Sequence, residues 1–158
     1  MKSSVLEIFV QDLINYIDNC FANDSRVPKT KAPQGQLSFT KNLIQETKKS
    51  FYVVNCLGNS PKNETLNATK TLQLNLQIDV FSLAGTFGGK QYLPEGMSIV
   101  LQNAISDYME ELKFGDYNEN IILMREVTSS PAMPYDNGER AYFSSLRYQI
   151  EIMRDYIS

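Results

Sequence analysis

The sequence predicts an α+β fold, a two-layer sandwich in which an antiparallel four-stranded sheet carries two helices on one face. Two segments repeat apolar residues at helical spacing, and two others alternate apolar and polar residues over long runs. The expected order is helix, two strands, helix, two strands. Strands with one apolar face and helices with one apolar stripe bury both most economically in two layers. The chain has 158 residues and no internal repeat, so we expect one domain over residues 1–158.

A first helix is expected over residues 4–21. Ser4 and Glu7 have the spacing of a capping box, in which each side chain satisfies a backbone N–H of the first turn. Behind them, apolar residues recur at three-four spacing and predict one buried stripe. These residues are Val5, Ile8, Phe9, Leu13, Tyr16, Ile17 and Cys20.

The region from about residue 22 to 70 is polar and is interpreted as a loop or arm interrupted by strands. Its start, 22–35, loses apolar content and is expected to be an exposed loop. A short strand is expected over 36–41 and a clearer one over 51–57, which is rich in aromatic and β-branched residues. Residues 58–70 are expected to form a long hairpin loop.

Residues 71–80 carry the clearest strand pattern, with every second residue apolar. Residues 81–91 contain three glycines and are expected to form a flexible loop. The pair at 88–89 does not belong to a phosphate-binding glycine motif. A second helix should begin near Pro94 and stop near Gly115, with one stripe of core residues between them.

The last part of the chain is expected to be a strand, a turn-rich segment and a second strand. Residues 120–128 contain spaced aliphatic residues, whereas 129–139 hold prolines, Asp, Asn and Gly. Residues 142–152 alternate again and predict a long strand with one apolar face.

The composition argues against an enzyme. Histidine is absent from the sequence, which excludes Ser–His–Asp and Cys–His arrangements and histidine metal ligands. Cys20 and Cys56 lack metal-binding spacing and are expected to be buried free thiols. We therefore expect no catalytic residues, no cofactor and no metal. The net charge of -3 argues against nucleic-acid recognition, and no stretch is apolar enough to span a membrane.

Charge is unevenly distributed and suggests a subunit interface. Basic residues dominate 26–49 and acidic residues dominate 107–119. Opposite patches on one domain suit head-to-tail self-association that closes a ring, although exposed charge runs usually serve solubility. The candidate interface residues are Lys29, Lys31, Lys48, Lys49, Asp107, Glu110 and Glu111.

Three further residues are candidates for docking. Met133 and Tyr135 lie in the turn-rich segment, and such residues often anchor interfaces; an ordinary hairpin connection is the alternative. Phe143 falls on the polar side of its strand, where it is either a subunit contact or a semi-buried ring.

The second half of the chain resembles the tail terminator (tail-completion) proteins of long-tailed bacteriophages, including lambda U-type proteins and their counterparts in phages of Gram-positive hosts. The resemblance rests on the strand Leu72-Gln-Leu-Asn-Leu-Gln-Ile-Asp-Val-Phe-Ser82 and the helix from Met97 to Leu112. It also rests on the Pro-containing turn Thr128-Ser-Ser-Pro-Ala-Met-Pro-Tyr-Asp-Asn-Gly-Glu-Arg-Ala-Tyr142 and the strand from Ser145 to Met153.

The resemblance implies a small α+β subunit that forms a homohexameric ring on the tail tube. This ring would stop tube polymerisation and offer a surface to the head. The implied partners are other copies of the chain, the major tail tube protein and the head-tail connector protein. The implied location is the tail-neck junction of the virion, after assembly in the host cytoplasm. The family's interfaces have no invariant residues, so no site is carried over.

The resemblance has one departure and leaves alternatives open. Residues 22–70 are longer and more polar than the family pattern. A head-completion or neck adaptor protein has a similar size and also forms rings. A small binding module on a ferredoxin-like sheet is a third interpretation. Against it, the polar strand face lacks the stacked aromatics of RNA-binding sheets; its residues are Gln73, Asn75, Gln77, Gln149 and Arg147.

Overall fold

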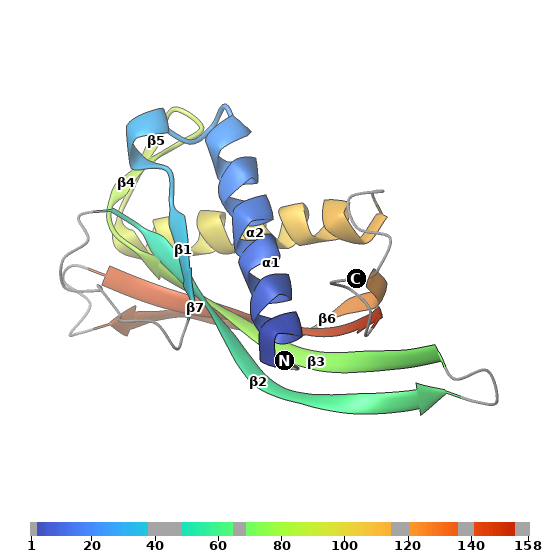
Figure 1. Ribbon diagram of the computed structural model, residues 1–158. Helices are drawn as coiled ribbons and strands as arrows, with labels where there is room; N and C mark the ends of the chain where they lie inside the picture. The colour runs from blue at the N-terminus through green and yellow to red at the C-terminus, as the bar shows by residue number, and fades with distance from the viewer. Residues whose placement is uncertain (1–2, 38–48, 65–68, 115–120, 136–140, 154–158) are drawn as a thin grey trace.

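The computed structural model describes residues 3–37, 49–64, 69–114, 121–135 and 141–153. Two helices pack against a mainly antiparallel sheet, which confirms the α+β class (Figure 1). The sheet has five strands rather than the four predicted, in the order β1-β2-β3-β7-β6, and it is mixed. The strands are β1 (Gln34–Leu37), β2 (Phe51–Glu64), β3 (Thr69–Ser82), β6 (Ile121–Tyr135) and β7 (Ala141–Met153).

The additional strand is β1, which pairs in parallel with β2 from Gln34↔Phe51 to Leu37↔Val54. All other pairs in this sheet are antiparallel. The predicted short strand at 36–41 was therefore placed two residues too late at its start, and most of its expected length lies outside the described residues. Its direction could not be predicted because a four-residue strand carries no readable alternation.

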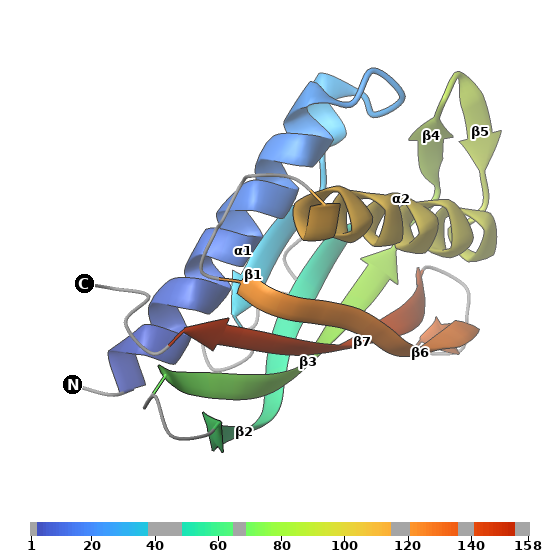
Figure 2. The ribbon, with the colours of Figure 1, turned by 90° about the vertical axis from the view of Figure 1, so that its right-hand side faces the viewer.

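The first helix is longer than predicted, by one residue at its start and two at its end, whereas the second has the predicted bounds. Helix α1 spans Ser3–Asn23 and helix α2 spans Pro94–Phe114. Their buried residues belong to the same cluster as alternate residues of β3 and β7, so both helices cover one face of the sheet, as predicted (Figure 2). On α1 the stripe includes Val10, Ile14 and Phe21, whereas Ile8 is exposed, so the buried face is rotated from the one expected.

In the two central strands, β3 and β7, the alternation correctly predicts which residues face the core. Leu74, Leu76, Ile78 and Val80 of β3 are buried beneath the helices. The corresponding residues of β7 are also buried, and they are Leu146, Tyr148, Ile150 and Ile152. Because side chains alternate between faces, the neighbours of these residues lie on the opposite face, which we call the open face.

Three segments predicted as loops contain strands. Strand β2 continues to Glu64 and β3 begins at Thr69, so most of the predicted loop at 58–70 is paired. Strand β6 continues to Tyr135, through most of the predicted turn region. The prolines that suggested turns are tolerated because β6 is an edge strand and, among the described strands, β2 beyond Val54 pairs only with β3. Register shifts between Ser130 and Met133 accompany the prolines of β6.

The third such segment forms a separate hairpin of β4 (Gly85–Phe87) and β5 (Lys90–Tyr92) on the helix side of the molecule (Figure 2). Gly88 and Gly89 form its turn with φ values of 61° and 80°, which suits glycine in a two-residue hairpin turn. Between α1 and β1, the predicted exposed loop contains a short 3-10 helix, η1 (Lys29–Lys31), and buries Val27.

Candidate subunit interface

An acidic groove lies between the C-terminal halves of α1 and α2. Asp107, Glu110 and Glu111 are exposed on α2 and line it, so the structure brings together the three acidic candidates. From α1 and the residues just after it, the groove is lined by Asn19, Cys20, Asn23, Asp24 and Arg26.

Asp24 and Arg26 form a charged clamp at one end of the groove. Two nitrogens of the Arg26 guanidinium donate to the Asp24 carboxylate at 2.8 and 3.0 Å, and the Tyr108 hydroxyl donates to it at 2.5 Å. The Arg26 hydrogen bonds lower the pKa of Asp24 from its ordinary value, against the effect of burial. Burial, followed by the bond to Asp24, raises the pKa of Tyr108. The clamp joins the end of α1 to α2.

The clamp also holds the β4–β5 hairpin. The Arg26 guanidinium carbon lies 4.8 Å from the centre of the Phe87 ring, in a cation–π contact. The Gly88 N–H donates to the Arg26 carbonyl oxygen at 2.8 Å. Arg26 is therefore engaged within its own chain, and among the described side chains it forms the only ion pair, with Asp24.

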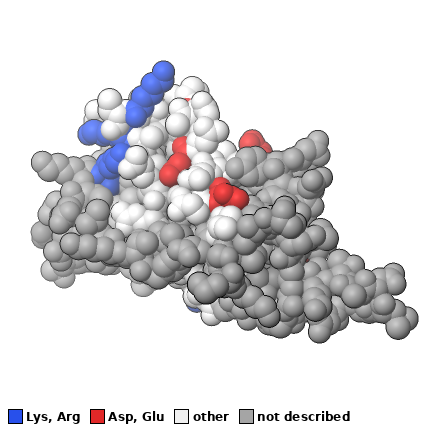
Figure 3. Space-filling view, in the orientation of Figure 1, with Lys and Arg blue, Asp and Glu red and all other residues white. Residues whose placement is uncertain are grey.

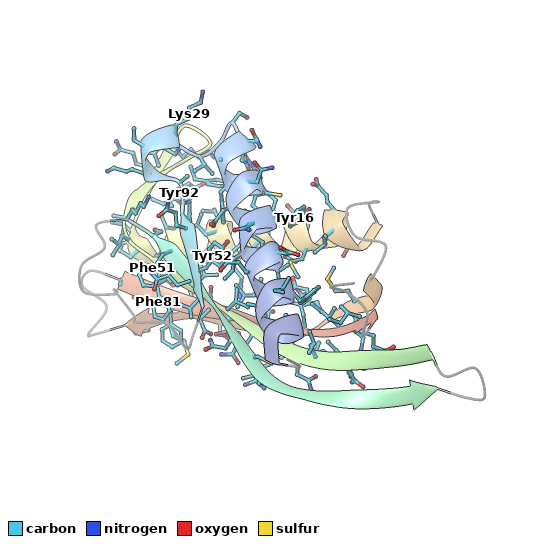
Figure 4. All side chains as sticks on the ribbon, in the orientation of Figure 1. Tyr16, Lys29, Phe51, Tyr52, Phe81 and Tyr92 are labelled. Carbon is cyan, nitrogen blue, oxygen red and sulfur yellow. The ribbon has the colours of Figure 1, made fainter. Side chains whose placement is uncertain are left out.

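The basic candidates lie on a different part of the surface. Lys31 is exposed and Lys49 is half-buried, and both line one small pocket beside η1. Lys29 is exposed in η1 and points away from the body (Figure 4). Lys48 lies outside the described residues. In Figure 3 the basic side chains gather at one end of the face shown, and the acidic side chains lie nearer its middle.

Asp18 holds the strand that follows η1. Its Oδ1 accepts hydrogen bonds from the Tyr52 hydroxyl at 2.6 Å and from the Gly35 N–H at 2.9 Å. Burial nevertheless raises the pKa of Asp18, and these bonds together with the charge of Lys49 only partly oppose the rise. Burial also raises the pKa of Tyr52, whose ring points toward α1 (Figure 4). This network fixes β1 against α1 and β2.

The open face of the sheet carries an apolar row that the sequence analysis missed in part. Phe51, Phe81 and Phe143 are direct partners on β2, β3 and β7, and Met133 of β6 follows opposite Phe143. The ring centroids of Phe51 and Phe81 are 5.0 Å apart, and those of Phe81 and Phe143 are 6.0 Å apart. Figure 4 shows Phe51 and Phe81 side by side.

Two of the three docking candidates, Phe143 and Met133, belong to this apolar row. Phe143 is half-buried in the stack, in agreement with the semi-buried alternative, and Met133 is 48% exposed at its end. Tyr135 is the last residue of β6 and pairs with Ala141. The prediction that this face lacks stacked aromatics was wrong. Phe51, Phe81 and Phe143 lie in one row across three strands, and this row can be recognised only once the pairing of the strands is known. For Phe81 the available signal was that it falls on the polar side of its strand, in line with Gln77 and Asp79.

Around Asp79 the open face carries a polar network. The Asp79 carboxylate accepts hydrogen bonds from Asn55, Gln77 and Ser145 at 2.6 to 2.7 Å. The Arg147 guanidinium donates to Gln77 at 2.9 Å across β3 and β7. These cross-strand contacts help to fix the register.

The described residues offer no metal site: they contain no group of three Cys, Asp or Glu side chains placed to hold an ion. Cys20 and Cys56 form no disulfide bond, and both are half-buried rather than buried as predicted. Neither helix of the described chain combines the length and apolar character that a membrane crossing requires.

Comparison with models of known protein families gives no match, and comparison with curated protein sequences gives none.

Proposed function

We propose that this chain is a structural protein of a bacteriophage virion, a tail terminator. Its copies form a homohexameric ring that caps the tail tube, stops tube polymerisation and presents a surface for the head-tail connector. The proposal starts from the resemblance of residues 72–153 to that family. It implies no catalysis and no cofactor.

The observation that carries the proposal is the separation of acidic and basic side chains on the surface of the chain. The acidic groove lies at the C-terminal halves of both helices, whereas Lys31 and Lys49 lie around a pocket on another side of α1. Two different complementary surfaces on one chain favour a head-to-tail contact, and such contacts build rings when the rotation closes. The same separation is less useful to a monomer, for which interspersed charges give solubility.

Native mass spectrometry at high protein concentration, with and without magnesium, tests ring formation. We expect a hexamer, and negative-stain images should show a central hole. The second step mixes the protein with polymerising tail tube protein of its phage. A terminator shortens the tubes and is found at one tube end; tubes of unchanged length without a cap would contradict the proposal.

A neck adaptor is the alternative within the same virion, and the charge separation supports it equally because adaptors also form rings. The two differ in their partner, since an adaptor binds the portal side of the head and leaves tube growth unchanged. The tube-capping experiment therefore separates them.

A nucleic-acid-binding module on the open face has less support. Base recognition on a sheet uses aromatic rings whose faces are available for stacking. Both faces of the Phe81 ring are instead occupied, by Phe51 on one side and Phe143 on the other. Titration with single-stranded RNA at low salt tests this alternative, and we expect no binding.

A further inference from the structure

The pocket beside η1 has an apolar floor and a basic rim. Lys31 and Lys49 line its rim, and neither ammonium group has an ion-pair partner within 4 Å among the described side chains. The pocket is small, with room for about two water molecules rather than for a cofactor. Its floor consists of buried apolar side chains, which are Val27, Phe87, Met97 and Leu101.

These properties define the ligand. A carboxylate at the mouth of the pocket can accept hydrogen bonds from both ammonium groups without entering the apolar floor. An aspartate or glutamate side chain on another protein surface presents such a carboxylate at its tip. Because the pocket is too small for a metabolite, its basic rim suits an acidic protein surface.

The same chain carries a matching segment at the other end of α2. Glu110 and Glu111 are exposed, and no ion pair joins either of them to a described side chain. Asp24, in the same groove, is already neutralised by Arg26. Leu101 lines the pocket ten residues before Glu111, so about 15 Å of helix separates the two sites. They cannot meet within one subunit.

We propose that the basic rim formed by Lys31 and Lys49 in one copy binds the exposed carboxylates of Glu110 and Glu111 in the next copy. This inference rests on the proposed ring and names the contact that builds it. Helix α2 then spans each subunit from one interface to the other: its N-terminal half lines the pocket, and its C-terminal half carries the carboxylates. The contact is head-to-tail because the two surfaces differ.

Two charge-reversed variants test the contact. The pocket variant is Lys31→Glu with Lys49→Glu, and the helix variant is Glu110→Lys with Glu111→Lys. Each alone replaces attraction by repulsion, and we expect the dissociation constant of the oligomer to rise at least about tenfold. In an equimolar mixture the acidic pocket of one variant matches the basic helix of the other, and both contacts are restored.

The mixture gives the sharper result, because a ring of alternating variants closes only with an even number of subunits. Native mass spectrometry should therefore show mixed oligomers with equal numbers of the two variants. A single chain with all four substitutions should also assemble. As a control, Arg125→Glu with Arg147→Glu changes the net charge by as much as the pocket variant does, but on the open face. This control should leave assembly unchanged.

Circular dichroism of each variant verifies folding. The charge of Lys49 acts on Asp18, so if the pocket variant unfolds, Lys29→Glu with Lys31→Glu replaces it. If the variants assemble as well as the wild type, the proposed contact is wrong, but the proposed ring is not contradicted. A wild type and a mixture that both remain monomeric also overturn it, and tube capping then decides the proposed function independently.

Discussion

The ring of Tyr52 occupies the space beside Gly35, so a Cβ atom on Gly35 would lie only 2.6 Å from the Tyr52 hydroxyl oxygen. The same hydroxyl is held by Asp18, so the ring cannot turn away without breaking that bond. Strand β1 can therefore approach β2 and α1 this closely only with glycine at position 35.

Gly35→Ala should lower the free energy of unfolding by about 1–3 kcal/mol, because the methyl group must displace a buried ring. Urea unfolding followed by circular dichroism measures the change. Gly85→Ala is the matched control, since a Cβ atom there would have 3.7 Å to its nearest neighbour, Met97. Equal stability of the Gly35 variant and the wild type would show that β1 has room to shift.

Asp18 should make the protein more stable at mildly acid pH. Its raised pKa means that the folded carboxyl binds a proton more tightly than the unfolded one. The resulting stabilisation is full below the ordinary aspartate pKa of 3.8 and is lost as pH rises through the raised value.

Asp18→Asn removes this dependence, which thermal unfolding at a series of pH values between about 4 and 7 can detect. We expect the wild type to gain stability relative to the variant as pH falls through this range. Asp107→Asn removes an exposed carboxylate instead and serves as the control. Parallel pH profiles of wild type and Asp18→Asn would contradict the expectation.

Asp24 should have the opposite pH dependence. Its pKa is lowered in the folded state, mainly by Arg26, so its stabilisation is present above the ordinary value of 3.8 and is lost as pH falls. Asp24→Asn should lower the free energy of unfolding at neutral pH by about 1–2 kcal/mol, because charged hydrogen bonds become neutral ones. Urea unfolding at pH values from neutral to acid measures both effects. A variant with unchanged neutral-pH stability would mean that the clamp contributes little.

The phenylalanine stack should contribute to stability as a unit. Phe81→Ala removes the central ring and should lower the free energy of unfolding by about 2 kcal/mol. A double-mutant cycle with Phe143→Ala should give a coupling energy of about 0.5–1.5 kcal/mol. Met133→Ala, at the exposed end of the row, should change stability by less than about 0.5 kcal/mol. Additive effects of the two phenylalanine substitutions would contradict a stack.

The parts of the fold that could be predicted are those with a periodic signal. The stripe on α2 and the alternation in β3 and β7 placed the core correctly, because burial on one face leaves a repeating pattern. Strand β1 and the β4–β5 hairpin are too short for such a pattern. Strands β2 and β6 were predicted too short because Pro61, Pro131 and Pro134 suggested turns, yet at an open edge a missing N–H is tolerated.

The candidate interface was predictable only as a charge distribution. Sequence order could show that lysines cluster before residue 50 and carboxylates after residue 107, but not that Lys31 and Lys49 share a pocket. It also could not show that Arg26, counted among the basic residues, is paired with Asp24. These facts depend on contacts between segments far apart in the chain.

The prolines of β2 and β6 also bear on how copies of this chain can associate. An exposed strand edge normally invites another strand, and repeated addition of that kind builds fibrils without a fixed size. Pro61 of β2 and Pro131 and Pro134 of β6 have no backbone N–H to offer an incoming strand. Association of copies is thereby directed to side-chain surfaces, whose fixed angle allows an assembly to close on itself and stop growing.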